Sequence, residues 1–402
     1  MRQRAYMDYN ATAPLRPEAL AAALAAFEAA GNPSSVHAEG RAARMLVEGA
    51  RADVAALAGV KPSGVIFTSG GTEAARMAFH AARTVQGVER LVVSAIEHDA
   101  ILASAEASGL PVDIAPVDTQ GRLDLAGLHA LLATGGKTLV ALMLANNETG
   151  ILQPVAEAAA LAHEAGALLL CDAVQAAGKI ALDFDKLGVD MMMLGGHKIG
   201  APMGVGALIL RDGLPFAALA VGGGQEMRRR AGSENVSGIA GFGAAARAAI
   251  EELDTFAALG RLRDGLEARI FDIAPDAVFF GKGVERLPNT SYLAAPGLDA
   301  ATLLMALDLD GVAVSAGAAC SSGKIGRARV LDAMGVSDDL SRGAVRVSLG
   351  WSSDATDITR FVESWSRVYR RVREKGVVRG EHMNVNVNAG PAHAPGLAAV
   401  ER

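Results

Sequence analysis

The stretch "ALLLCDAVQ", residues 167–175, decides the fold of this 402-residue chain. Five apolar residues run without a break up to Asp172, and a turn follows at once. A short run that is apolar throughout, without alternating polar residues, is typical of a strand buried on both faces. The stretch therefore predicts an inner strand of a parallel sheet, with Asp172 at its carboxyl end.

Similar short apolar runs recur on both sides of this strand. They occupy residues 65–70, 90–95, 138–144, 190–196 and 206–210. Segments with helical spacing separate most of these runs and lie at residues 72–86, 98–108, 124–133 and 154–165. Buried strands that alternate with helices predict βαβ units and a mostly parallel sheet sandwiched by helices, which is an α/β fold.

The pattern changes near residue 255. A long helix predicted over residues 236–270 leads into short strands at 277–281, 291–295, 312–317 and 344–350, with helices at 299–308 and 354–374. This order indicates a smaller α+β domain. We therefore expect four parts: residues 1–15 joining the small domain, a large domain over 16–255, the small domain over 256–380, and a disordered tail over 381–402 that lacks periodicity.

The composition argues against several classes of protein. The formal net charge is −6, whereas a protein that binds nucleic acid normally carries a basic surplus. No apolar run reaches the roughly 18 residues that a membrane span needs, and the N-terminus has no secretory pattern. The chain has two cysteines, too few for a disulfide framework, and no spacing typical of a metal site. We expect a cytoplasmic protein without a metal.

Polar residues follow three of the predicted strands, where ligands bind in open parallel sheets. Asp172 ends one strand, although a helix N-cap would explain it equally well. His197 and Lys198 lie in a glycine-rich turn after another strand, and a lysine placed there is suited to forming a Schiff base. Residues 67–75 read as strand, glycine turn and helix start, where Thr72 and backbone N–H groups could bind an anion.

These three features together match the needs of one cofactor. Pyridoxal 5'-phosphate (PLP) requires a lysine for its aldehyde, a carboxylate facing its pyridine nitrogen and a helix N-terminus for its phosphate. Lys198, Asp172 and the turn before Thr72 supply one of each. The anion turn alone is a weak signal, because many such turns bind nothing. The three together predict a PLP enzyme.

Eleven motifs then indicate a family. In chain order they are DYNATAP, GNPSSVH, FTSGGTEA, EHDAIL, NNETG, DAVQAAGK, GGHKIGAPMG, GGGQE with GSENVSGI, SAGAACSSG and VRVSLG. Over nearly the whole chain, from residue 8 to about 370, they resemble the cysteine desulfurases of the NifS/IscS type. That family forms part of the class V branch of fold-type I PLP enzymes. The resemblance implies the fold-type I architecture, PLP as cofactor and a homodimer.

The resemblance also implies roles around the cofactor. Lys198 would bind the aldehyde, Asp172 would pair with the pyridine nitrogen, and His98 would stack on the ring. The phosphate would be held by Gly71, Thr72 and His197, together with Ser233 from the neighbouring subunit. The phenolic oxygen or the substrate would be contacted by Asn147 and Gln175.

The remaining roles concern L-cysteine, the substrate that the resemblance implies. Arg346 would bind its carboxylate, a group that the guanidinium fork matches. Cys320, in the small-residue segment 315–324, would take the sulfur as a thiolate, and the glycines around it allow a mobile loop of the NifS/IscS type. The resulting persulfide would be passed to an acceptor, such as an iron–sulfur scaffold protein.

The sequence departs from the family pattern at three places, of which the first removes one expected phosphate contact and the extra arginine charge would partly offset that loss. Gly195 replaces a serine whose hydroxyl binds phosphate in the family, and Met227, Arg228 and Ala231 alter the glycine-rich GGGQEMRRRAG segment. The pair Ala75 and Arg76 replaces two polar residues. We expect somewhat weaker PLP binding without loss of function.

Other functions stay open at this point. A selenocysteine lyase or a small-substrate aminotransferase would use the same fold and would not need Cys320. An inactive relative could serve as a sulfur-transfer scaffold, although it would have no need to keep Lys198, Asp172, His98 and Cys320 together. Taken alone, Cys320 would be an ordinary loop residue, and Cys171 within its apolar run is expected to be a buried packing residue. The sequence does not identify the acceptor.

Overall fold

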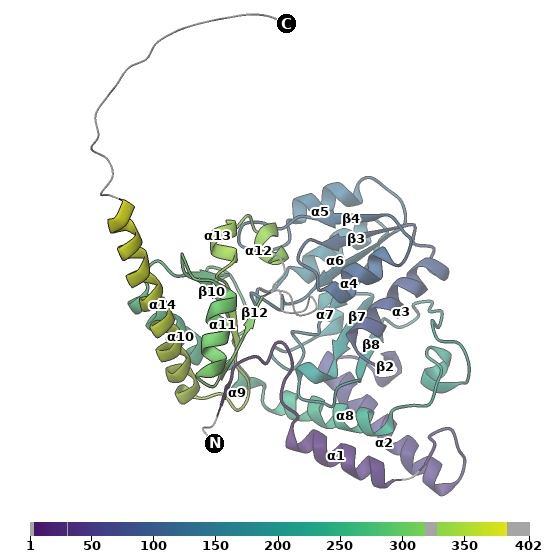
Figure 1. The fold of residues 1–402 in the computed structure, drawn as a ribbon. Helices are drawn as coiled ribbons and strands as arrows, with labels where there is room; N and C mark the ends of the chain where they lie inside the picture. The colour runs from purple at the N-terminus through teal and green to yellow at the C-terminus, as the bar shows by residue number, and fades with distance from the viewer. Residues whose placement is uncertain (1–3, 30, 318–327, 384–402) are drawn as a thin grey trace, which may run out of the picture.

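The computed structural model describes residues 4–29, 31–317 and 328–383 of the chain. It has two lobes, one built on a seven-stranded sheet and one on a four-stranded sheet (Figure 1). The N-terminal segment runs along the smaller lobe before it enters the larger one at helix α1 (Pro17–Glu28). Cys320 lies outside the described residues.

The seven-stranded sheet confirms the mostly parallel α/β prediction. Its strand order is β2-β8-β7-β6-β5-β3-β4, and strands β3 to β7 pair in parallel, whereas β8 is antiparallel to both neighbours. The strands are β2 (Val65–Thr68), β3 (Arg90–Ser94), β4 (Val112–Ala115), β5 (Thr138–Met143), β6 (Leu168–Asp172), β7 (Met191–Gly195) and β8 (Gly206–Leu210).

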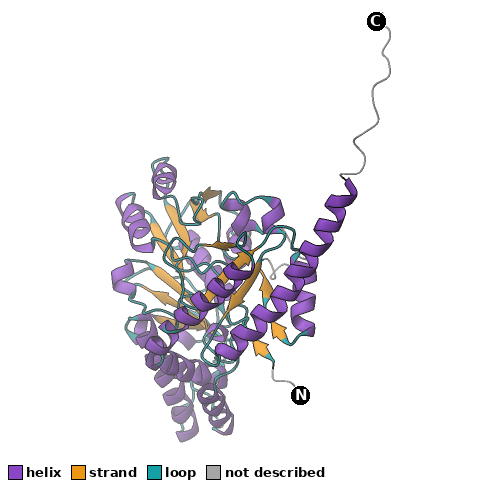
Figure 2. Cartoon of the chain, turned by 90° about the vertical axis from the view of Figure 1, so that its left-hand side faces the viewer, coloured by secondary structure: helices purple, strands orange, loops and turns teal. Residues whose placement is uncertain are grey.

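Helices cover both faces of this sheet (Figure 2). Successive residues of β6 separate accordingly: Leu169 and Cys171 pack on one face, and Leu170 packs on the other. The first face is covered by α2 (Ala38–Ala58), α5 (Leu125–Leu132), α6 (Val155–Glu164), α7 (Phe184–Leu187) and α8 (Val236–Glu251); the second is covered by α3 (Gly71–Thr84) and α4 (Asp99–Glu106). Burial on both faces explains the apolar run that the sequence shows at β6.

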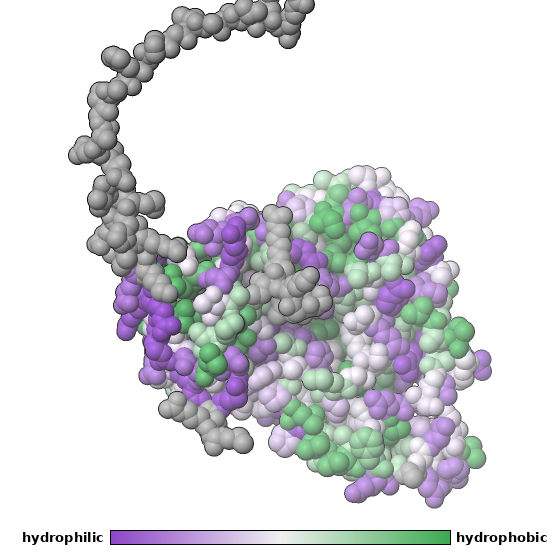
Figure 3. All heavy atoms as spheres, viewed as in Figure 1, coloured by the Kyte–Doolittle hydropathy of each residue, from purple (hydrophilic) through white to green (hydrophobic). Residues whose placement is uncertain are grey.

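The smaller lobe holds an antiparallel sheet of order β12-β13-β10-β9. Its strands are β9 (Val278–Phe280), β10 (Thr290–Ala294), β12 (Ser315–Ala316) and β13 (Val345–Ser348), and a separate pair joins β1 (Ala5–Tyr6) to β11 (Val312–Ala313). Its helices include α11 (Ala300–Leu309), α12 (Arg329–Ala333), α13 (Asp338–Ser341) and α14 (Ala355–Met383), together with two helices that precede β9 and are described below. Short 3-10 turns elsewhere are η1 (Pro62–Gly64), η2 (Gly196–Lys198) and η3 (Gln225–Arg228). Polar side chains gather on the outer side of α14 (Figure 3).

Two predicted boundaries are wrong. The single helix expected over residues 236–270 is three helices, α8, α9 (Leu253–Ala257) and α10 (Leu259–Ile273). The chain changes cores there: Phe242 of α8 packs in the large lobe, whereas Phe256 and Leu259 pack in the small lobe. In addition, α14 continues three residues into the predicted tail, ending at Met383. Among the described helices, none combines the length and apolar character needed to cross a membrane.

A buried ion pair anchors the altered glycine-rich segment to the large lobe. Arg51 of α2 donates to both carboxylate oxygens of Glu226, at 2.7 and 3.0 Å, and the Phe67 N–H donates to the same carboxylate at 2.9 Å. The side chains of Arg51 and Glu226 are 4% and 2% exposed. Glu226 and the two residues after it adopt positive φ angles, a backbone that these side chains rarely take.

We expect Glu226→Ala to lower the free energy of unfolding by about 3–5 kcal/mol, because it leaves the Arg51 guanidinium buried without its partner. Urea denaturation measures the loss. Glu48→Ala is the matched control, since Glu48 contacts the same arginine but is 58% exposed, and it should cost less than about 1 kcal/mol. Equal losses in the two variants would contradict this account.

Candidate active site

A cavity of about 210 Å³ opens at the carboxyl edge of the large sheet. Eight residues predicted from the sequence line it together: Gly71, Thr72, His98, Asn147, Asp172, Gln175, His197 and Lys198. They come from the ends of β2, β3, β5, β6 and β7, because the carboxyl ends of parallel strands meet at one edge. The residues predicted to bind the cofactor therefore surround one cavity.

Asp172 is the last residue of β6, and its carboxylate is 6% exposed. Burial raises its pKa to about 6, although the Val174 N–H bond at 2.9 Å and the nearby Lys198 both favour the charged form. The sheet thus holds a carboxyl that is poorly solvated and needs a cationic partner. A protonated pyridine nitrogen would be such a partner.

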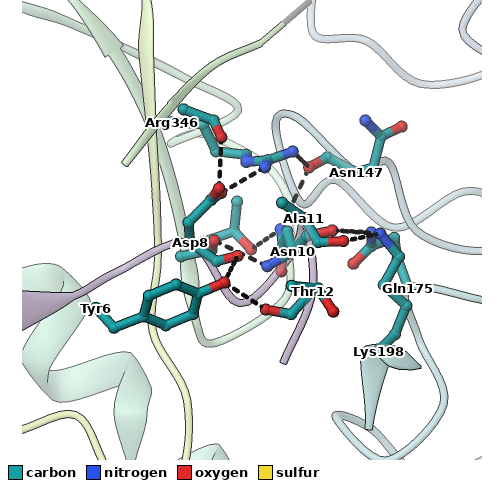
Figure 4. Close-up of polar contacts among 12 residues, drawn as sticks. Tyr6, Asp8, Asn10, Ala11, Thr12, Asn147, Gln175, Lys198 and Arg346 are labelled. Carbon is teal, nitrogen blue, oxygen red and sulfur yellow. Dashed lines mark hydrogen bonds and ion pairs between the residues drawn. The ribbon is translucent and has the colours of Figure 1, made fainter. Parts of the chain in front are cut away.

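Lys198 is held at the cavity by the N-terminal segment. Its Nζ donates to the carbonyl oxygens of Asn10 at 2.6 Å and Ala11 at 2.8 Å (Figure 4). Both acceptors are backbone groups that follow β1, so their positions depend on the small lobe. The amine is therefore placed at the cavity wall by contacts between residues far apart in the sequence.

Two histidines near Lys198 are kept neutral. Burial lowers the pKa of His98, and Lys198 adds to the effect. Burial, with Lys198 and His98, lowers the pKa of His197 to about 4. The Nδ1 atom of His98 accepts the Ala100 N–H at 3.0 Å, so its proton lies on Nε2. An uncharged imidazole in this orientation is suited to stacking on an aromatic ring.

The start of α3 provides an anion cradle. Its cap residue, Gly70, supplies no side-chain hydrogen bond to the first-turn N–H groups of this helix, and such groups can bind an anion. Gly71 and Thr72 line the cavity at this point. A Cβ atom on Gly71 would lie 3.2 Å from the Met193 side chain and 3.3 Å from that of Val174, which favours glycine there.

The cavity accordingly fits PLP. The chain offers an amine at Lys198, a buried carboxyl at Asp172 that a cation would stabilise, a neutral ring at His98 and uncapped amides at α3. Each matches one part of the cofactor. The absence of a side chain at Gly195 suits the packing of this cavity, because a Cβ atom there would lie 3.2 Å from the Val174 side chain. The weaker PLP binding expected from Gly195 stays a prediction.

Two described residues from the predicted site, Arg346 and Ser233, are not part of this cavity lining. Arg346 on β13 is buried, and it donates to the Asn147 carbonyl at 2.9 Å and to Asp8 at 2.7 Å (Figure 4). It therefore lies beside a cavity residue while already paired with a carboxylate. Ser233 is exposed on the loop before α8. Cys320 lies outside the described residues.

Sequence reasoning missed the part played by the N-terminal segment. Asp8 accepts from Arg346 and also from the Ser315 hydroxyl at 2.6 Å, while Asn10 touches both lobes. The motif DYNATAP supplied a signal, because it was one of the family marks. Residues 1–15 were expected to join the small domain, but no contact with the site was predicted for them, since nothing local in the sequence indicates contacts with residues more than 130 positions away.

Two buried carboxyls near the site were also not predicted. Glu97 precedes His98, and burial together with Asp172 raises its pKa well above the ordinary range. Burial raises the pKa of Glu148 to about 7, against the lowering effect of Arg346. A Cβ at Gly317 would overlap the side-chain oxygens of Glu148 and Tyr292, which favours glycine at that position.

The chain belongs to the class-V aminotransferase family, whose model matches residues 5–361. The members are PLP-dependent enzymes. Among its relatives, a cysteine desulfurase of Cereibacter sphaeroides is 43% identical over 368 residues, or 90% of this chain and 94% of the relative. The cysteine desulfurase IscS of Dictyoglomus turgidum is 37% identical, covering 93% and 96%.

Solved structures of similar proteins support the same fold and family. A NifS-like protein from Rickettsia africae ESF-5 is 32% identical, with a TM-score of 0.83 over 92% of this chain and all of that one. SspA, solved in complex with cysteine, is 26% identical, with a TM-score of 0.73 over 86% of this chain and 98% of that one. The architecture predicted from the motifs is therefore confirmed.

Proposed function

We propose that this chain is a PLP-dependent cysteine desulfurase that converts L-cysteine to L-alanine and leaves the sulfur on Cys320 as a persulfide. The observation that carries the proposal is the meeting of Lys198, Asp172 and the α3 N-terminus in one cavity. The many cysteine desulfurases among the relatives support the choice of reaction.

Bound PLP would supply an electron sink that makes the Cα–H bond of the substrate acidic. Lys198 would hold the cofactor aldehyde and, once released, move the proton at Cα, since its Nζ lies at the cavity wall. Asp172 would keep the pyridine nitrogen protonated. Arg346 and Asn147 would bind the substrate carboxylate, which would replace Asp8 as the partner of the guanidinium.

Cys320 would attack the substrate sulfur as a thiolate. An S–S bond forms, the Cβ–S bond of the substrate breaks, and the carbon keeps that electron pair and takes the thiol proton, which gives alanine. The sulfur stays on Cys320 as a persulfide, so no outside oxidant is needed. We infer further that a homodimer completes the site with Ser233 and that an acceptor protein, such as an iron–sulfur scaffold, receives the sulfur.

The test is turnover of L-cysteine by the PLP-loaded protein with a mild reductant, with alanine and sulfide both quantified. We expect equal amounts from the wild type and a loss of at least about 100-fold in Cys320→Ala. Cys171→Ala is the matched control, because Cys171 is buried in β6 and burial raises its thiol pKa. It should keep the activity.

The alternatives predict other results. Activity that survives Cys320→Ala would favour a selenocysteine lyase, whose reaction does not need this thiol. Amino-group transfer to an oxo acid, without sulfide, would favour an aminotransferase. If the protein binds PLP but forms neither alanine with sulfide nor an aminotransferase product, the result would favour a sulfur-transfer scaffold.

A further inference from the structure

Lys179 is a buried lysine that the proposed mechanism does not use. Its side chain is 3% exposed, and burial lowers its pKa well below the ordinary value, helped by Lys198 and Arg346. The amine donates to Gln175 Oε1 at 2.8 Å and to Asn10 Oδ1 at 2.7 Å. A group that is so costly to bury needs a reason to be there.

Asn10 fixes one side of this arrangement. Its Oδ1 also accepts from the Asn289 amide at 3.2 Å, and its Nδ2 donates to the Thr290 hydroxyl at 2.9 Å. These contacts come from the small lobe and determine which end of the Asn10 amide faces Lys179. The lysine amine therefore lies in a frame of fixed acceptors.

Gln175 completes the arrangement. Its oxygen accepts from Lys179. One of its two N–H groups donates to the Asn10 carbonyl at 2.8 Å (Figure 4). An amide nitrogen has two hydrogens, so the second remains available, and Gln175 lines the cavity. With its oxygen engaged behind it, Gln175 offers the cavity an N–H group.

We propose that Lys179 is a positioning residue that holds the Gln175 amide with an N–H group toward the phenolic oxygen of bound PLP. The inference rests on the proposed function, because it needs PLP in this cavity. Without Lys179, the buried oxygen of Gln175 would lack a donor, and the amide would be free to turn. The phenolic oxygen would then lose the hydrogen bond that stabilises its ionised form.

The visible absorption of the PLP-loaded protein provides the test, because its pH midpoint reports the proton shared by the phenolic oxygen and the Lys198 nitrogen. A donor to that oxygen lowers the midpoint. We expect Lys179→Met to raise it by about one pH unit, which corresponds to a tenfold change in the proton equilibrium. Lys186→Met, at an exposed lysine on α7, should leave it unchanged. The other titratable groups facing the site, Asp172, His98, His197 and Arg346, are the same in both variants.

A double-mutant cycle separates positioning from a general effect of the charge. In a Gln175→Ala background, Lys179→Met should no longer move the midpoint, because there is no amide left to hold. If Lys179→Met does not fold, Lys179→Gln replaces it, since that side chain is one atom too short to reach both acceptors. A wild-type midpoint in the Lys179 variant, or an equal shift in both backgrounds, would overturn the proposal. A wild-type protein without any visible band would instead overturn the proposed function itself.

Discussion

Lys198→Ala is expected to lower kcat for alanine formation by about 10³-fold, because no other described amine lines the cavity to move the Cα proton. The variant should still take up PLP, through Asp172, His98 and the uncapped α3 amides, but the cofactor should dialyse away more easily without its covalent link. Alanine release under saturating L-cysteine, and PLP retained after dialysis, measure the two effects.

Lys186→Ala is the matched control for this prediction. Lys186 is exposed on α7 and pairs with Asp183, so its loss should change neither quantity. A Lys198→Ala protein with turnover within about tenfold of wild type would contradict the role assigned to this amine, since general acid–base catalysis typically contributes more than that.

Asp172→Asn is expected to have two effects of opposite sign. It should lower kcat by about 100-fold, because a neutral amide cannot keep a pyridine nitrogen protonated. It should also stabilise the PLP-free protein by about 3 kcal/mol above pH 6. The second effect follows from burial, which raises the pKa of Asp172 from 3.8 to about 6.

The pH window follows from that shift. Below pH 4 the carboxyl is protonated in both states, so it contributes no difference. Between pH 4 and 6 the unfolded chain releases the proton while the folded chain keeps it, so stability falls as the pH rises. Above pH 6 the penalty is complete, and the asparagine variant avoids it.

Urea unfolding of PLP-free wild type and Asp172→Asn between pH 4 and 8 measures this difference. Asp183→Asn is the control: a hydrogen bond from Lys186 lowers the pKa of Asp183, so its loss should not stabilise the protein at high pH. A gain in Asp172→Asn that does not depend on pH would contradict the account, as would unchanged activity.

How far the sequence predicts this molecule depends on how local each signal is. The six apolar runs mark six strands of the large sheet, because strands buried on both faces need apolar side chains throughout. Strand β4 was missed because it lies at the sheet edge, where three of its four residues are not buried. The long helix over 236–270 was wrong because a change of core leaves no break in helical spacing.

In the site as well, residues with a local sequence signal could be predicted, and contacts between distant segments could not. Strand ends and motifs predict the eight cavity residues, since each follows a recognisable strand. The contacts of Asp8, Asn10 and Lys179 could not be predicted, because they form only when the N-terminal segment meets both lobes. The resemblance assigned Arg346 to the substrate carboxylate, but it did not indicate that Arg346 forms an ion pair with Asp8.

The central claim is that sulfur leaves L-cysteine and arrives on Cys320. The most direct measurement is the mass of the peptide containing Cys320 after the PLP-loaded protein has met L-cysteine without reductant. We expect that peptide to gain the mass of one sulfur atom, with one alanine released for each sulfur gained. Alanine released while the Cys320 peptide keeps its original mass would contradict the account.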